Sequence, residues 1–185
     1  MISRYIGIAA AAIAFGLCGS RTLADDVALT ARVQAAYDAQ CADVMRGDFA
    51  AFQATLSPNF TGELNGRTVT RDGVVTNLRN SASTISLSKC MTTIDSVQQS
   101  GGAVIAVVHQ LIDGTLTSAQ GTAPIEIAAG KRDMWTSAGD AFVQTSSMSI
   151  WSTVSVNGEI VQQTGTPPSA PPPSAAPAPN GTPAP

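Results

Sequence analysis

Four side chains carry the chemistry that this sequence offers: Tyr37, His109, Asp133 and Trp135. His109, the chain's one histidine, lies in the apolar run 107–111, which is typical of a strand. The pKa of histidine lies close to neutrality, so His109 suits proton transfer. The alternative is a structural histidine, hydrogen-bonded inside the sheet or at its rim.

Asp133 follows Arg132 on a predicted strand that spans 125–136. Neighbouring residues on a strand point to opposite faces, so Asp133 shares its face with Trp135 and not with Arg132. Asp133 is therefore the better candidate for a pocket, and Trp135 is expected in the core or in the pocket wall. The alternative for Asp133 is a charge at the edge of the sheet that discourages aggregation.

Tyr37 lies on a predicted helix, 27–46, and points toward whatever that helix covers. Apolar residues recur on this segment at spacings of three and four, and Gly47 follows as a stop signal. A functional tyrosine is one interpretation, and a buried tyrosine with one ordinary hydrogen-bond partner is the other.

Several common kinds of site are missing from the sequence pattern. One histidine, spaced cysteines and scattered carboxylates do not form the ligand spacings of a metal site. Gly101 and Gly102 belong to a turn between strands, so they do not form a phosphate-binding loop. No G-x-S-x-G motif occurs, and no serine–histidine triad is indicated. We therefore expect neither a metal nor a cofactor.

The remaining elements predict an α+β fold. Asp48 is expected to cap a second helix that ends before Pro58, and Asn65-Gly66 is a strong hairpin signal. A short helix is expected at 72–78, and strands at 84–97, 103–111, 125–136, 141–156 and 159–161. Helices followed by long strands favour a strongly curved, mainly antiparallel sheet wrapped around the long helix and two short ones, a cone-shaped α+β barrel. The interior of such a cone is the natural ligand site.

The N-terminus has the pattern of a cleavable signal peptide over residues 1–24. Arg4 supplies the positive charge, an uncharged apolar run follows, and Ala24 ends the segment at a site suited to cleavage. The apolar run is roughly 13 residues, short of the ~20 that span a bilayer, so no stable membrane anchor is expected after cleavage. The mature protein is expected to be exported, either periplasmic or secreted.

Charge argues against a nucleic-acid partner. Cleavage would leave eight basic residues against 13 acidic ones, a net charge of −5. The one adjacent basic pair, Lys131-Arg132, is no footprint for a phosphate backbone. Residues 27–165 form the predicted domain, and 166–185 form a proline- and alanine-rich tail with nothing to bury, which predicts disorder.

Two cysteines, Cys41 and Cys90, would remain after cleavage. In an oxidising compartment an even pair suggests a disulfide, which would add about 2–4 kcal/mol to the free energy of unfolding. Two buried thiols are the alternative.

The order of these elements and several short segments resemble the nuclear transport factor 2-like superfamily, over about residues 30–156. The segments are Tyr37 with 45–49, then 56–60, then 132–135 with Gly139-Asp140. Within that superfamily they look closest to small secreted relatives of the SnoaL-like polyketide cyclases and the ketosteroid isomerases. Phe142 stands where these relatives often carry a tryptophan.

The resemblance implies the cone fold, and it implies pairing of two copies through the face of the sheet. In the isomerase relatives a tyrosine near the pocket donates a hydrogen bond to an oxyanion, which is a role that Tyr37 resembles. Because the fold hosts both enzymes and binding domains, it does not choose between them.

Two functional hypotheses follow. The first is an exported domain that binds a small apolar molecule in the cone or interacts through its sheet. It rests on the scarcity of titratable groups along the strands. The second is an acid–base lyase, isomerase or cyclase, which requires His109, Tyr37 and Asp133 to converge on one cavity.

Overall fold

A computed structural model describes residues 23–64, 66–139 and 141–168. Three helices, α1 (Leu23–Arg46), α2 (Phe49–Ala54) and α3 (Arg71–Ala82), precede the long strands. The strands are β1 (Leu56–Leu64), β2 (Arg67–Thr70), β3 (Ile85–Ser100), β4 (Ala103–Ser118), β5 (Gly121–Ala138), β6 (Ala141–Val156) and β7 (Glu159–Thr164). The expected leader up to residue 22, and the tail from 169, lie outside the described residues.

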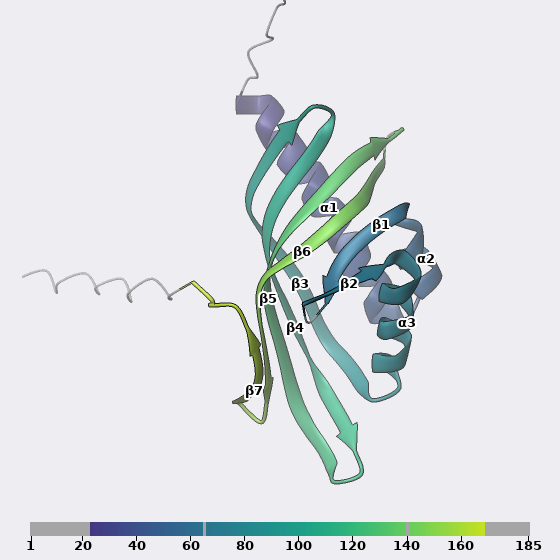
Figure 1. Ribbon diagram of the computed structural model, residues 1–185, viewed down its shortest axis with the longest axis vertical. Coiled ribbons are helices and arrows are strands. Elements are labelled where there is room, and N and C mark those ends of the chain that lie inside the picture. Colours follow the sequence, from purple (N-terminus) through teal and green to yellow (C-terminus); the bar gives the residue numbers. More distant parts are fainter. Residues whose placement is uncertain (1–22, 65, 140, 169–185) are drawn as a thin grey trace, which may run out of the picture.

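The sheet is mixed and strongly curved. Its order is β2-β1-β6-β5-β4-β3, with β7 paired to β6. All pairs are antiparallel except β1 with β6, which run parallel. α1 packs along β3 on one face, while α2 and α3 lie beside β1 at one end of that face (Figure 1). The α+β cone expected from the sequence is confirmed.

Local signals in the sequence fix the ends of the helices. Gly47 has a φ of +70°, a conformation that glycine adopts at low cost, and it ends α1. The side chain of Asp48 accepts a hydrogen bond from the backbone N–H of Ala51 and caps α2. Thr70 caps α3 in the same way, through the N–H of Gly73. None of the helices in the described ranges is long and apolar enough to cross a bilayer.

A compact core fills one end of the concave face. α1 contributes Val33 and Tyr37, and Trp135 of β5 is fully buried against them. Partly buried apolar residues surround this cluster, including Phe142 at the position noted in the sequence. The other end of the same face is hollow.

Candidate functional site

The hollow end is a cavity of about 610 Å³, lined by residues of the three helices and of the sheet. This volume lies within the range of small-molecule sites, roughly 300–1,000 Å³. Most of its wall is apolar and comes from several elements: Phe49, Phe52, Leu56, Phe60, Val74, Leu78, Ile112, Ile127 and Val154. Polar side chains gather where the cavity meets the core: Gln40, Thr92, Gln110, Lys131, Asp133, Gln144 and Ser147.

A buried hydrogen-bonded chain connects the core to the cavity. The indole N–H of Trp135 donates to the Tyr37 hydroxyl at 3.1 Å, and that hydroxyl donates to Oδ2 of Asp133 at 2.7 Å. The rings of Tyr37 and Trp135 meet edge to face, with centroids 4.9 Å apart. Burial raises the pKa of Tyr37 far above its ordinary value, and the neighbouring Asp133 charge adds to the effect, so the Tyr37 hydroxyl keeps its proton and donates it to Asp133 while accepting from Trp135.

Asp133 has one carboxylate oxygen without a partner. Its side chain is 2% exposed, and within the described part of the chain Oδ1 receives no hydrogen bond. Burial raises the pKa of Asp133, while the charge of Lys131 and the polar groups of Ser147, Tyr37 and Gln144 oppose this effect. A buried acceptor without a hydrogen bond costs folding free energy, so Oδ1 is a natural place for a ligand to donate a hydrogen bond.

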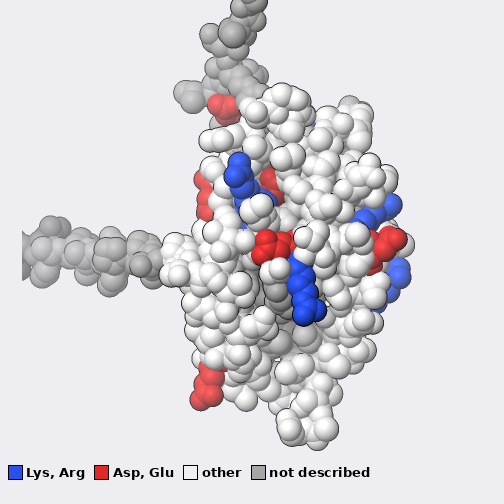
Figure 2. Space-filling view, viewed as in Figure 1, with Lys and Arg blue, Asp and Glu red and all other residues white. Residues whose placement is uncertain are grey.

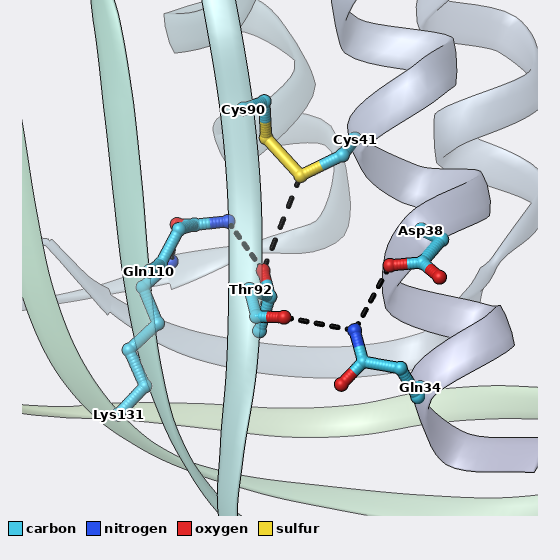
Figure 3. Close-up of a disulfide and its surroundings, with 7 residues drawn as sticks. All are labelled: Gln34, Asp38, Cys41, Cys90, Thr92, Gln110 and Lys131. Atoms are coloured by element: carbon cyan, nitrogen blue, oxygen red, sulfur yellow. Dashed lines mark hydrogen bonds between the residues drawn. A yellow bond between two sulfur atoms is a disulfide. The ribbon is translucent and has the colours of Figure 1, made fainter. Parts of the chain in front are cut away.

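Lys131 lies two residues before Asp133 on β5 and faces the same cavity. Its amine donates to Oε1 of Gln110, whose amide nitrogen lies 3.5 Å from Oγ1 of Thr92. Burial lowers the pKa of Lys131, and the nearby Asp133 charge opposes this shift. Figure 3 shows Lys131 and Gln110 side by side on neighbouring strands.

A disulfide joins Cys41 of α1 to Cys90 of β3 at the cavity wall (Figure 3). Thr92 lies beside it, with Oγ1 4.0 Å from Sγ of Cys41. The backbone carbonyl of Thr92 accepts a hydrogen bond from the side chain of Gln34 on α1, at 2.8 Å. The helix is therefore fixed to the sheet next to the polar side chains of the cavity.

His109 lies on the opposite, convex face of the sheet. Its Nδ1 is 2.8 Å from Oδ1 of Asp95, and its ring lies 5.6 Å from that of Trp151. Trp151 in turn covers Gly130, where an added Cβ would fall 2.1 Å from the indole nitrogen. The expected convergence of His109 with Tyr37 and Asp133 is therefore wrong, because strand alternation turns Val108 and Gln110 inward and His109 outward.

The structure thus brings together Tyr37, Asp133 and Trp135 of the residues singled out from the sequence. Sequence reasoning missed Lys131 and its partner Gln110. The alternation that placed Asp133 with Trp135 also places Lys131 on that face, and this was the available signal.

Charge elsewhere on the molecule is sparse. Acidic and basic groups are scattered over the visible surface, and no patch of one sign dominates it (Figure 2). No group of three or more histidine, cysteine, aspartate or glutamate residues suited to a metal ion occurs in the described ranges. Within the described residues, the cavity is therefore the better candidate for a functional site than any surface patch of charge.

Comparison with known proteins yields structural similarity only. No family model matches this chain. No curated protein matches its sequence either.

Three solved structures illustrate the similarity. A conserved protein from Planctomyces limnophilus superposes with a TM-score of 0.59 at 10% identity, covering 66% of this chain and 94% of its own. An NTF2-like protein from Cytophaga hutchinsonii gives 0.52 at 12% identity, covering 63% and 93%. A Catenulispora acidiphila protein in complex with S-DNPA gives 0.54 at 21% identity, covering 66% and 94%.

Proposed function

We propose, from the premise that this chain has the nuclear transport factor 2-like fold, that it is an exported domain that binds one small, mainly apolar molecule in its cavity. The observation that carries the proposal is the 610 Å³ cavity with apolar walls and a buried, unpartnered oxygen of Asp133 among its lining residues. The signal-peptide pattern at the N-terminus supports export.

The two parts of the cavity make different demands on a ligand. Its apolar wall favours a hydrocarbon body, since burying apolar surface contributes about 25 cal/mol per Å². Its polar end favours a single hydroxyl or carbonyl group, which would meet Asp133 and Lys131. The structure of the Catenulispora acidiphila protein, which has a similar fold, is a complex with S-DNPA, and this supports the proposal of a bound ligand.

Native mass spectrometry of the mature protein purified from its own host tests this proposal directly. A small molecule that leaves on mild denaturation would support it and give the ligand's mass. Binding of the neutral dye Nile red gives a second measure. A clean ligand-free mass together with no saturable Nile red binding would overturn the proposal.

A pair of tryptophan substitutions locates the binding. Ile127 lines the cavity, whereas its neighbour Glu126 is exposed on the other face of β5. Ile127→Trp fills the cavity and should weaken Nile red binding about tenfold or more, equivalent to ~1.4 kcal/mol. Glu126→Trp is the matched control and should leave binding unchanged. Equal effects would place the dye elsewhere.

Acid–base catalysis by a lyase, isomerase or cyclase is the second candidate function. The hydrogen bond of 2.7 Å from Tyr37 to Asp133 favours it, because it orients a carboxyl of raised pKa at the cavity. His109 takes no part in this version. Incubation with the ligand recovered from the host should then give a new product by chromatography, and Asp133→Asn should abolish it while Nile red still binds. An unchanged ligand would rule the candidate out.

A second copy of the chain is the partner we propose for the convex face. Met134, Met148 and Ile150 are 39%, 56% and 50% exposed there. The exposed Arg132 pairs with Met148 across β5 and β6, and Asp95 lies on the same face, so a two-fold contact can match opposite charges. Met148→Glu should convert a dimer to a monomer in sedimentation equilibrium, whereas Ile160→Glu on β7 should not. A monomeric parent protein would refute the pairing.

A further inference from the structure

We propose that Lys131 is an amine nucleophile that forms an imine with the carbonyl carbon of an aldehyde or ketone held in the cavity. This inference rests on the proposed ligand-binding function and names a chemical class for its ligand. The geometry behind it is a lysine side chain on the cavity wall, held by a neutral amide and not by a carboxylate.

Lys131 is set apart from the rest of the chain's amines. The sequence contains two lysines, Lys89 and Lys131. Lys89 is 45% exposed and lies 3.7 Å from a carboxylate oxygen of Asp113. Lys131 lines the cavity, donates to Oε1 of Gln110, and makes no ion pair within the part of the chain described.

The hydrogen bond to Gln110 leaves the amine free to react. A neutral amine uses one N–H to donate to the amide oxygen, and its lone pair remains available for another direction. Gln110 is itself held in place, because its amide nitrogen lies 3.5 Å from Oγ1 of Thr92 and can donate there. Thr92 on the neighbouring strand β3 therefore fixes the amide of Gln110 so that its oxygen points toward Lys131.

The environment of Lys131 and Asp133 favours their uncharged forms. Burial lowers the pKa of Lys131 and raises the pKa of Asp133. A neutral amine beside a carboxylic acid carries the same total charge as the ion pair, so moving one proton between them leaves the cavity's net charge unchanged. Only the neutral amine is nucleophilic, and a lowered pKa increases the share of Lys131 in that form at a given pH.

The reaction balances with groups that are present. The lone pair of Nζ forms the C–N bond while the carbonyl π electrons move to oxygen, which gives a carbinolamine after proton transfer. The hydroxyl then leaves as water, and the two protons originally on the amine end on that water. No oxidant, reductant or metal is required.

Asp133 is placed to move these protons. It faces the same side of β5 as Lys131, about 7 Å further along by the rise of a strand. Tyr37 donates to Oδ2, so Oδ1 is the oxygen that is free to carry the acid proton. In that form Asp133 can protonate the departing hydroxyl and then recover a proton from nitrogen.

Reductive trapping tests the inference on the full mature protein. Benzaldehyde is the carbonyl probe, and cyanoborohydride reduces any imine to a stable benzylamine that peptide mapping assigns to Lys131 or Lys89. Because each unit of pKa depression raises the neutral fraction of an amine about tenfold, we expect labelling of Lys131 to exceed that of Lys89 by about that factor for every unit by which burial lowers its pKa. Equal labelling, or faster labelling of Lys89, would overturn the inference.

Variants separate this inference from the ligand-binding proposal. Lys131→Met keeps most of the side chain's volume and should lose the cavity label, while Lys89→Arg should keep it. Asp133→Asn should slow labelling of Lys131 while Nile red still binds. If Nile red binds the parent protein but Lys131 stays unlabelled, imine formation is wrong and ligand binding stands. If neither occurs, both proposals fail.

Discussion

The two faces of β5 have opposite character although their residues alternate along one strand. Lys131 and Asp133 point into the cone, where burial shifts the pKa of each toward the uncharged form. Arg132 and Met134, between and beyond them, lie exposed on the convex face. The reactivity of a charged side chain on β5 therefore depends more on the face it occupies than on its residue type.

Two hydrogen-bonded aspartates illustrate the difference. Tyr37 reaches Asp133 at 2.7 Å, and His109 reaches Asp95 at 2.8 Å. The first pair is buried and backed by Trp135, whereas the side chains of the second are 41% and 38% exposed. Similar distances thus carry very different energetic weight, because water screens and replaces the outer pair.

The largest expected effect comes from removing a tryptophan on the concave face. Trp135→Ala should lower the free energy of unfolding by about 3–5 kcal/mol, since it empties a fully buried site and removes the donor to Tyr37. Trp151→Ala, on the convex face, should cost less because that ring is partly exposed. Urea unfolding of the two variants measures the contrast, and equal losses would break it.

Replacing both cysteines of the disulfide by serine tests how strongly this bond holds α1 over the concave face. Cys41→Ser with Cys90→Ser should lower the free energy of unfolding by about 2–4 kcal/mol, because the unfolded chain loses a cross-link. The bridge spans 49 positions of sequence. The measurement is urea unfolding of both proteins without reductant. The convex face is not touched, so any oligomer should persist, and its loss would show that the faces are coupled.

The pH dependence of stability should distinguish Asp133 from carboxylates on the surface. Its raised pKa means that folded protein retains a proton that the unfolded chain has released. The stability associated with that proton is fully present below the ordinary aspartate pKa of about 3.9 and is lost as pH rises through the raised pKa.

Asp133→Asn removes this titration. The stability of the variant relative to the parent should therefore rise as the pH increases above about 4, by at most ~1.4 kcal/mol per pH unit. Urea unfolding at a series of pH values above about 4 measures the slope. Asp95→Asn is the control on the convex face, and a matching slope there would contradict the contrast between the faces.

The smallest effect should come from the outer pair. His109→Ala removes a partly exposed hydrogen bond to Asp95 and should change the free energy of unfolding by no more than about 1 kcal/mol. Nile red binding should remain as in the parent protein. A large loss of binding would mean that the convex face communicates with the cavity.

Sequence patterns predicted most of the fold because they report local geometry. The apolar spacing of the first helix and Gly47 predicted its end at Arg46, and strand 141–156 was predicted with the bounds that the structure shows. Strands β4 and β5 extend beyond the predicted ranges, to Ser118 and Ala138. Their ends are rich in serine, threonine and glycine, and pairing with neighbouring strands, not local preference, keeps them extended.

The site was harder to predict because it depends on which face turns inward. Alternation links Asp133 to Trp135 correctly, but it does not tell which face of β4 carries His109. Asp95 sits in a register shift between Ile94 and Ser96, and this irregularity accompanies its pairing with His109. Such a shift depends on pairing between distant segments and leaves no local mark in the sequence.

The separation of the compact core from the cavity bears on how this protein can diversify. Val33 and Trp135 hold one end of the concave face, while Ile112, Ile127 and Val154 line the hollow at the other. Substitutions in the second group reshape the cavity without removing a residue of the core cluster, which meets the cavity at Tyr37 and Val108. Descendants of such a gene can therefore change the molecules they accept over few mutational steps, without first acquiring compensating changes that rescue folding.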